Sequence, residues 1–116
     1  MAKAGGGQAP PEVVLWMRDR AARPVAFGAT STGERLVSGP AILLGYSIRE
    51  STGAAAAAVR LRNGADATGA IVATIGLAAS GSDTQMPTDP GLICDVGVWL
   101  EVVSGSVEGS VHVRDC

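Results

Sequence analysis

The stretch AILLGYSIRE, residues 41–50, decides the fold class. Its side chains alternate between two sets, which is the pattern of a β-strand with two different faces. Glycine inside a strand is typical of a bulge or of close packing, so Gly45 marks an irregular point. A regular period of two places Ile42, Leu44, Tyr46 and Ile48 on one face, and Leu43, Gly45, Ser47 and Arg49 on the other.

A second alternating run lies close to the end of the chain. Between Val107 and Arg114, valine and glycine alternate with glutamate, serine, histidine and arginine. A tight Ser-Gly-Ser turn at 104–106 precedes this run, and a β segment over Leu92–Val103, interrupted near Gly97, comes before the turn. We expect the two segments to form a hairpin with one exposed face.

Turn residues divide the rest of the chain into short segments. Further strands are predicted at Val13–Met17, Pro24–Thr30 and Ala70–Leu77, and a loop at Ala78–Gly91. About eight strands, with turns every 8–12 residues, are typical of a β-sandwich. We therefore predict an all-β protein, an antiparallel β-sandwich or jelly roll, with residues 24–116 as one domain.

The alanine run Ala54–Ala58 has two interpretations. Alanine has the highest helix propensity, and Thr52 and Gly64 are suitable residues to begin and end a helix. Val59–Arg62 alternates strictly, however, and the Asn-Gly pair that follows is typical of a hairpin turn. We favour a strand in which the alanines let two sheets approach closely, and a helix is the alternative.

The composition is that of a folded protein with a largely aliphatic core. Hydrophobic residues make up 47% of the 116 residues and charged residues 17%, which excludes general disorder. Trp99 lies in a late apolar segment and is predicted to be in the core. We find no signal peptide and no apolar stretch long enough to span a membrane, so we expect a protein made in a cytoplasm, without a membrane partner.

The charge is distributed unevenly. The net charge is −2, which argues against a general nucleic-acid binder. Residues 1–35 carry five basic and three acidic side chains, whereas residues 36–116 carry four basic and eight acidic ones. Either this is chance solvation of a surface, or the N-terminal segment docks on an acidic partner. Residues 1–23 are predicted to be an extended arm, because the Gly-, Ala- and Pro-rich start cannot fold alone.

No set of residues carries an evident chemistry. A zinc site needs about four ligands, and the chain offers Cys94, Cys116 and the single His112. We expect both cysteines to be free thiols. The alternation of the last strand predicts that His112 lies exposed on its outer face, and no serine stands in a G-x-S-x-G motif to act with it as a nucleophile. Gly28–Gly33 is followed by Glu-Arg rather than by the Lys of a phosphate-binding loop.

The carboxylates are no more suggestive than these groups. Asp66, Asp83 and Asp89 lack the D-x-D spacing of a calcium loop. Glu101 and Glu108 flank the 104–106 turn and are in position to face each other, but an exposed hairpin has no cleft for a glycosidase pair. We therefore predict no catalytic residue, cofactor, metal or small-molecule substrate.

A partner-binding segment is predicted where the arm meets the body. Trp16 and Met17 come next to a row of charged residues, and tryptophan is a frequent anchor of interfaces. Packing in the core is the alternative for these two side chains. With the neighbouring Arg18, Arg20 and Arg23 they make up the predicted partner-binding set.

Three motifs between Ser38 and Arg114 resemble a known family. These are GYSIRESTG at 45–53, VRLRNGADATG at 59–69 and VVSGSVEG at 102–109. They are similar to small structural proteins of tailed bacteriophages, especially those that infect Actinobacteria. The similar stretch covers about two thirds of the chain. The resemblance implies a jelly-roll-like virion protein that decorates or cements the capsid, and it implies no catalytic residues. The first 37 residues match nothing in that family.

The leading functional hypothesis is a non-enzymatic virion protein on the capsid exterior. It would bind the major capsid protein as a trimer, with residues 1–23 along capsid proteins or neighbouring subunits. The alternative is an adhesion or receptor-binding module of the tail or baseplate. Such a module would need exposed aromatic rings for sugars, and the chain has only 3% aromatic residues. A small enzyme and a cellular interaction domain are further alternatives.

Overall fold

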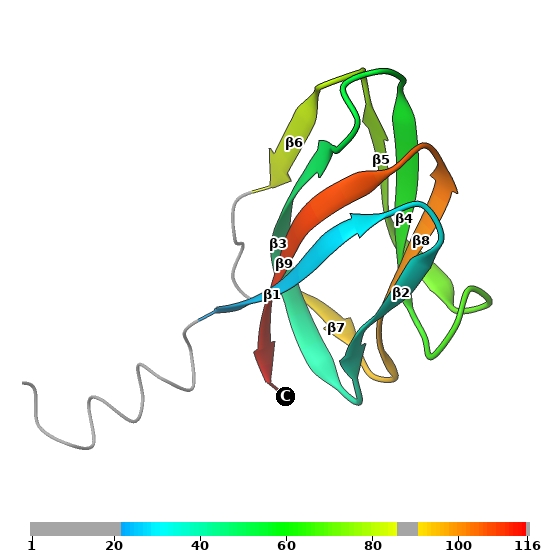
Figure 1. Cartoon of the computed structure of the whole chain (residues 1–116). Helices are drawn as coiled ribbons and strands as arrows, with labels where there is room; N and C mark the ends of the chain where they lie inside the picture. The colour runs from blue at the N-terminus through cyan, green and yellow to red at the C-terminus, as the bar shows by residue number, and fades with distance from the viewer. Residues whose placement is uncertain (1–21, 86–90, 116) are drawn as a thin grey trace, which may run out of the picture.

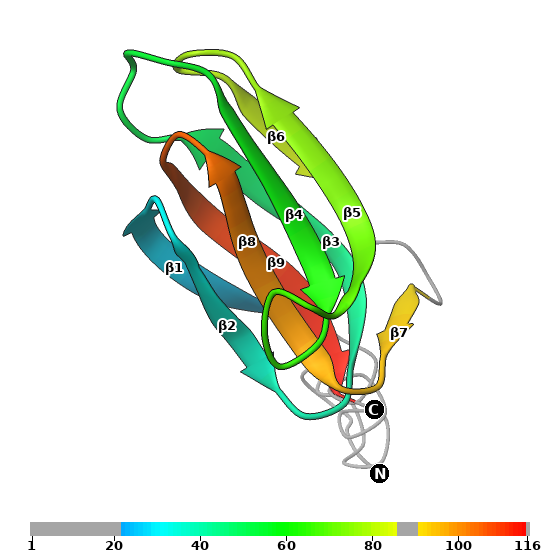
Figure 2. The same cartoon turned by 90° about the vertical axis from the view of Figure 1, so that its right-hand side faces the viewer.

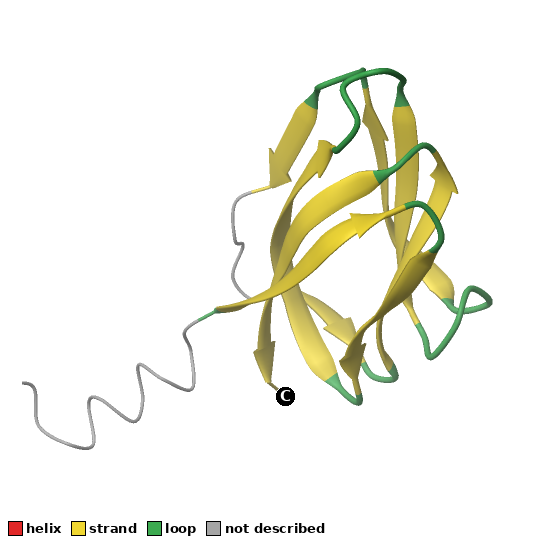
Figure 3. Cartoon of the chain, in the orientation of Figure 1, coloured by secondary structure: helices red, strands yellow, loops and turns green. Residues whose placement is uncertain are grey.

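A computed structural model describes residues 22–85 and 91–115 (Figure 1). All regular structure in these ranges is β-strand, as Figure 3 shows, so the predicted all-β class is confirmed. Residues 1–21, which include the predicted Val13–Met17 strand, lie outside the described residues. The strands are β1 (Arg23–Thr30), β2 (Gly33–Ser38), β3 (Ala41–Glu50), β4 (Ala57–Asn63), β5 (Ala70–Leu77), β6 (Ser82–Gln85), β7 (Leu92–Cys94), β8 (Gly97–Ser104) and β9 (Val107–Asp115).

The strands form two antiparallel sheets that pack face to face (Figure 2). One sheet has the order β1-β9-β3-β6, with β7 also paired to β3, and the other has the order β2-β8-β4-β5. Since β9 occupies one edge of β3, β6 and β7 share the other edge and act as one interrupted strand. The pairs are nested: first with last, second with next to last, and β4 with β5 in the middle. This folded-over hairpin is a jelly roll.

The chain changes sheet at every connection except those from β4 to β5 and from β6 to β7. The predicted hairpin of the last two strands is therefore wrong, because β8 and β9 belong to different sheets. The cause lies in the turn between them. Gly105 has φ +77°, and a Cβ there would lie 2.7 Å from both the Ala56 carbonyl oxygen and the Ala57 Cβ. The turn thus passes tightly against the start of β4 and redirects the chain to the other sheet.

The two faces of β3 differ from the predicted ones. The register of β3 against β9 shifts between Leu43 and Gly45, which confirms the irregular point at the glycine. The extra residue of such a bulge reverses the alternation of the residues that follow. Leu43 therefore points to the core at one end of the strand, and Ile48 points to it at the other. Ile42, predicted on the same face as Ile48, is paired with Arg114 on the outer face.

The predictions for Ala54–Ala58, a strand, and for Ala78–Gly91, a loop, are corrected in part. Ala54–Ala56 form a loop and only the last two alanines of the run begin β4, so the helix alternative is wrong. The β4–β5 hairpin is confirmed, with a longer connection at 64–69. The predicted loop over 78–91 contains β6, which pairs with β3. Its sequence Ser-Asp-Thr-Gln has no apolar residue, so periodicity gave no signal for it.

The core is built almost entirely from aliphatic side chains of both sheets. Their burial is the dominant favourable term in folding. Trp99 is not among them: its neighbours Val98 and Leu100 are fully buried, so the alternation of β8 turns the indole to the outer face. The prediction of a core position for this tryptophan is wrong. The largest fully buried side chains are Ile48, Leu61, Ile75, Leu100, Val59, Val98, Val107, Val111, Val113 and Cys94.

Candidate interaction site at the arm end

The two ends of the sandwich have different structures. We call one the arm end, because β1 starts there: it comprises the start of β1, the end of β9, the β2–β3 turn, the β4–β5 loop, β7 and the β7–β8 turn. Backbone hydrogen bonds tie these parts together, from Gly39 N–H to the Val96 carbonyl at 3.2 Å and from Gly64 N–H to the Gly97 carbonyl at 3.2 Å. We call the opposite end, with the loops at 31–32, 51–56, 78–81 and 105–106, the loop end.

Arg23 marks the point where the predicted arm joins the body. It is the first residue of β1 and pairs with Val113 of β9. Its guanidinium Nη2 lies 3.1 Å from a carboxylate oxygen of Asp115, and both side chains are largely exposed. Of the five predicted partner-binding residues, this one alone is described. Trp16, Met17, Arg18 and Arg20 lie outside the described residues.

Exposed apolar side chains gather at the arm end. Within residues 22–85 and 91–115, five large apolar side chains are strongly exposed, and four of them lie here. Single exposed apolar residues are ordinary, whereas several at one end make that end the candidate interaction site. Sequence reasoning missed this group, because the β segment predicted over Leu92–Val103 gives no sign of which of its apolar side chains are exposed. The four are Ile71, Leu92, Ile93 and Val96; the fifth, Val103, lies toward the loop end.

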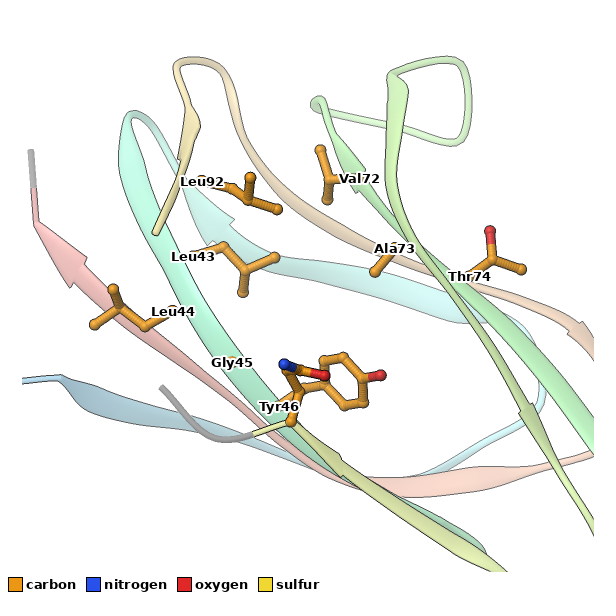
Figure 4. A pocket seen from close by; sticks show the side chains of 9 residues that line it. Leu43, Leu44, Gly45, Tyr46, Val72, Ala73, Thr74 and Leu92 are labelled. Atoms are coloured by element: carbon orange, nitrogen blue, oxygen red, sulfur yellow. The ribbon is translucent and has the colours of Figure 1, made fainter. Parts of the chain in front are cut away.

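An apolar cleft of about 380 Å³ opens between the two sheets beside this group. Figure 4 shows the cleft, with Leu92 and Leu43 from one sheet facing Val72 and Ala73 from the other. This volume lies within the range of small-molecule sites, about 300–1,000 Å³. The full lining is Leu43, Leu44, Gly45, Tyr46, Val72, Ala73, Thr74, Gln85 and Leu92.

The cleft has one polar end. The Tyr46 hydroxyl donates a hydrogen bond of 2.8 Å to a carboxylate oxygen of Asp83. Burial raises the pKa of the Tyr46 phenol above its usual value, and the Asp83 hydrogen bond and negative charge add to this. Thr74 and Gln85 bring further polar groups to the same lining. A ligand here would need a mainly apolar body and a small polar part.

The loop end, in contrast, is closed by hydrogen bonds around Glu50. This residue is only 4% exposed, and its carboxylate accepts the backbone N–H of Thr52 at 2.7 Å, of Gly53 at 2.6 Å and of Ser80 at 3.0 Å. The Thr52 hydroxyl donates a fourth bond. Led by the Ser80 N–H, these donors lower the pKa of Glu50 from 4.5 to about 2. The carboxylate therefore joins the loop after β3 to the loop after β5.

The carboxylates considered in the sequence are separated from one another. Glu101 lies 3.0 Å from the guanidinium of Arg62, on the sheet opposite to Glu108, which pairs with Arg49 at 3.3 Å. The expectation that the two glutamates face each other is wrong, since β8 and β9 are in different sheets. Asp66 accepts hydrogen bonds from the Thr68 side chain and backbone, which lower its pKa.

The histidine and the described cysteine have structural surroundings. His112 lies on the outer face of β9, as predicted, but is partly buried: its Nε2 is 3.4 Å from Ser110 Oγ, and its Nδ1 is buried without a hydrogen bond. Cys94 is a fully buried thiol, and Cys116 lies outside the described residues. The described residues hold no group of three or more potential metal ligands.

No membrane-crossing helix is present in the part of the chain that the structure describes.

Trp99, which was predicted to be in the core, lies on the outer face of the second sheet. It lies between Arg35 of β2 and Arg62 of β4, which are its two cross-strand neighbours. Arg62 is occupied, because it donates to Glu101 and, at 2.6 Å, to the Gly69 carbonyl. Arg35 is exposed. The outer face of the second sheet thus places a partly exposed indole beside an exposed guanidinium, an arrangement that suits cation–π contacts.

Comparison of the chain with protein-family models, curated proteins and solved structures finds no significant match.

Proposed function

We propose that this chain is a non-enzymatic structural protein of a tailed-phage virion, a decoration or cement protein bound to the outer surface of the capsid. Its partner would be the major capsid protein, and the body would assemble as a trimer. The predicted arm, residues 1–23, would lie along the partner surface.

The observation that carries this proposal is the composition of the arm end. Four of the five strongly exposed large apolar side chains of the described residues lie there, at the same end as Arg23, where the body receives the arm. An arm and a surface at the same end can contact one partner at the same time. Once one of them is bound, the other binds intramolecularly, so the overall avidity exceeds the affinity of either alone. The jelly roll is compatible with this role, since it occurs in viral capsid proteins, but the fold alone does not assign it.

Co-sedimentation with capsids of the encoding phage, stripped of this protein, tests the proposal. The full chain should pellet with capsids at a saturating ratio, and the chain lacking residues 1–21 should bind more weakly. A Trp99→Ala variant is the matched control, because it alters the other surface only. Absence of capsid binding by the full chain would overturn the proposal. Light scattering on the same samples measures whether the body is a trimer.

Trp99 and Arg35 favour one second candidate, an adhesion module of the tail or baseplate. Aromatic rings with a neighbouring guanidinium can stack on ligands, and this pair lies on an outer face. A glycan array probed with the full chain and with Trp99→Ala tests it. Glycan binding lost in that variant, without capsid binding, would replace the leading proposal by this one.

A further inference from the structure

We propose that, in the free protein, the apolar cleft at the arm end holds the stretch Val13–Met17 of the same chain. This stretch reads Val-Val-Leu-Trp-Met and lies outside the described residues. The inference goes beyond the proposed function, because it concerns the chain before it meets a partner and does not depend on that partner being a capsid.

The chemistry of the cleft suits this occupant. Its walls are aliphatic, and Leu92 is 51% exposed in the described structure although it faces Val72 across the opening. Covering such surface contributes roughly 25 cal/mol per Å². A covered indole buries about 150–250 Å², and its N–H needs an acceptor when buried. Thr74 and Gln85 bring such acceptors to the cleft lining. Trp16 therefore matches both parts of the cleft.

The register of the sheet shows that the stretch can reach the cleft. Arg23 pairs with Val113, Val113 with Leu43, and Leu43 with Leu92, so these four residues form one row across the sheet. Three strand spacings of about 4.8 Å separate the two ends of the row, which is roughly 14 Å. Six residue steps lead from Met17 to Arg23, and they span up to about 20 Å when extended.

The linking residues and the short tether also favour the same chain over a second copy. Residues 18–22 read Arg-Asp-Arg-Ala-Ala, a polar and small sequence that can cross a solvent-exposed edge. A segment on a short flexible tether has an effective concentration in the millimolar range. It therefore outcompetes the same segment of another molecule at lower protein concentrations.

Fluorine NMR on the full chain tests the inference. Both tryptophans are replaced by 5-fluorotryptophan, and Trp16→Phe assigns the two resonances. The change of chemical shift between H₂O and D₂O then reports the exposure of each indole. We expect the Trp16 resonance to lose most of this solvent shift relative to the free amino acid. In Leu92→Asp, which puts a charge on one wall of the cleft, the Trp16 solvent shift should return.

Two further variants complete the design. Val103→Asp is the matched control, since Val103 is 50% exposed but does not line the cleft, and it should leave the Trp16 resonance unchanged. Val72→Asp alters the opposite wall of the cleft and leaves β7 unchanged. It should also restore the Trp16 solvent shift, which would show that the effect of Leu92→Asp does not come from a disturbed β7. Circular dichroism checks that each variant keeps its strands.

Three outcomes would overturn the inference. The first is a Trp16 solvent shift equal to that of the free amino acid in the unaltered chain. The second is a Trp16 resonance that does not respond to either wall variant. The third is protection that disappears on about a tenfold dilution, which would indicate a second copy as the occupant. Capsid co-sedimentation is a separate measurement, so failure of this inference and failure of the proposed function are distinguishable.

Discussion

The two ends of this sandwich differ in how the groups beyond the strand ends are satisfied. At each end, strands stop and backbone groups and side chains lose their partners in the sheets. The loop end solves this internally, since Glu50 and a Ser51–Ser106 hydroxyl pair at 2.8 Å join three loops by hydrogen bonds. At the arm end, the described residues leave Leu92 and Ile93 exposed beside an open cleft. The difference is that the loop end carries the internal hydrogen bonds, whereas the arm end carries exposed apolar surface.

The largest expected effect is on the loop end. Glu50→Gln should lower the thermal midpoint on the order of 15 °C, because the amide replaces an acceptor of four hydrogen bonds by a group that also donates. Differential scanning calorimetry measures the change. Glu108→Gln is the matched control, since that carboxylate has a single partially exposed ion pair and should change little. Equal midpoints for the two variants would contradict a structural role for Glu50.

The same carboxylate should give the fold an acid-sensitive component. Its pKa is about 2 in the folded protein against an ordinary value of 4.5, so the folded state binds its proton less readily. The stabilisation is thus complete above about pH 4.5 and is lost as the pH falls toward 2. The thermal midpoint of the parent should fall in this window more steeply than that of Glu50→Gln. Parallel curves for the two proteins would show that other groups cause the acid sensitivity.

A moderate effect is expected at the turn that sends the chain from one sheet to the other. Gly105→Ala should destabilise the fold by about 1–2 kcal/mol, because a Cβ at φ +77° would approach Ala56 and Ala57 too closely. Urea unfolding measures the cost. Gly28→Ala is the comparison, since a Cβ there meets nothing within 4 Å. A difference of less than about 0.5 kcal/mol between these variants would mean that the turn relaxes easily.

At the arm end, stability and binding should separate. Ile93→Ser should change the free energy of unfolding by no more than about 0.5 kcal/mol, since the side chain is 71% exposed. It should nevertheless weaken capsid co-sedimentation by roughly tenfold, the loss typical of a contributing interface residue. Val103→Ser should affect neither quantity. If Val103→Ser weakened binding as much as Ile93→Ser, the contact surface would not be at the arm end.

The smallest effect is expected where the arm joins the body. Arg23→Ala removes an exposed ion pair with Asp115 and should cost at most about 0.5 kcal/mol. Urea unfolding at low and at about 1 M salt measures it, and the difference from the parent should vanish at high salt. A larger, salt-independent loss would show that Arg23 holds the end of the sheet by more than charge.

The strand content and the two-layer class could be predicted because apolar and polar side chains alternate visibly along segments such as Ala41–Glu50. Alternation does not indicate which strand a given strand pairs with. The run after Gly105 has the same period in a hairpin and in a strand that changes sheet, so the last pair of strands was mispredicted. The bulge at Leu43–Gly45 adds one residue and reverses the faces, which no fixed period can express.

The candidate site was less accessible to sequence reasoning, for the same reason. Leu92 and Ile93 have the composition of core residues, and only their position on an edge strand exposes them. Trp99 is a further example: it was predicted to be in the core, and its position in β8 places it on the outer face of the second sheet. Glu50 ends a predicted strand, and nothing in its sequence neighbourhood indicates that Ser80, far along the chain, donates to it. Arg23, the one described member of the predicted partner-binding set, is the first residue of β1, and its contact with a partner stays a prediction.

The nested pairing of the strands also sets when this protein can fold. β1 is paired along its length with β9, and Arg23 and Asp115 are 92 positions apart. At about 5–20 residues per second, a ribosome needs roughly 5–20 seconds to add that stretch after β1 has been made. During this interval none of the described strands that have already been made pairs with β1. Completion of this sheet therefore waits until β9 has been made, and such distant pairing is expected to make folding slow.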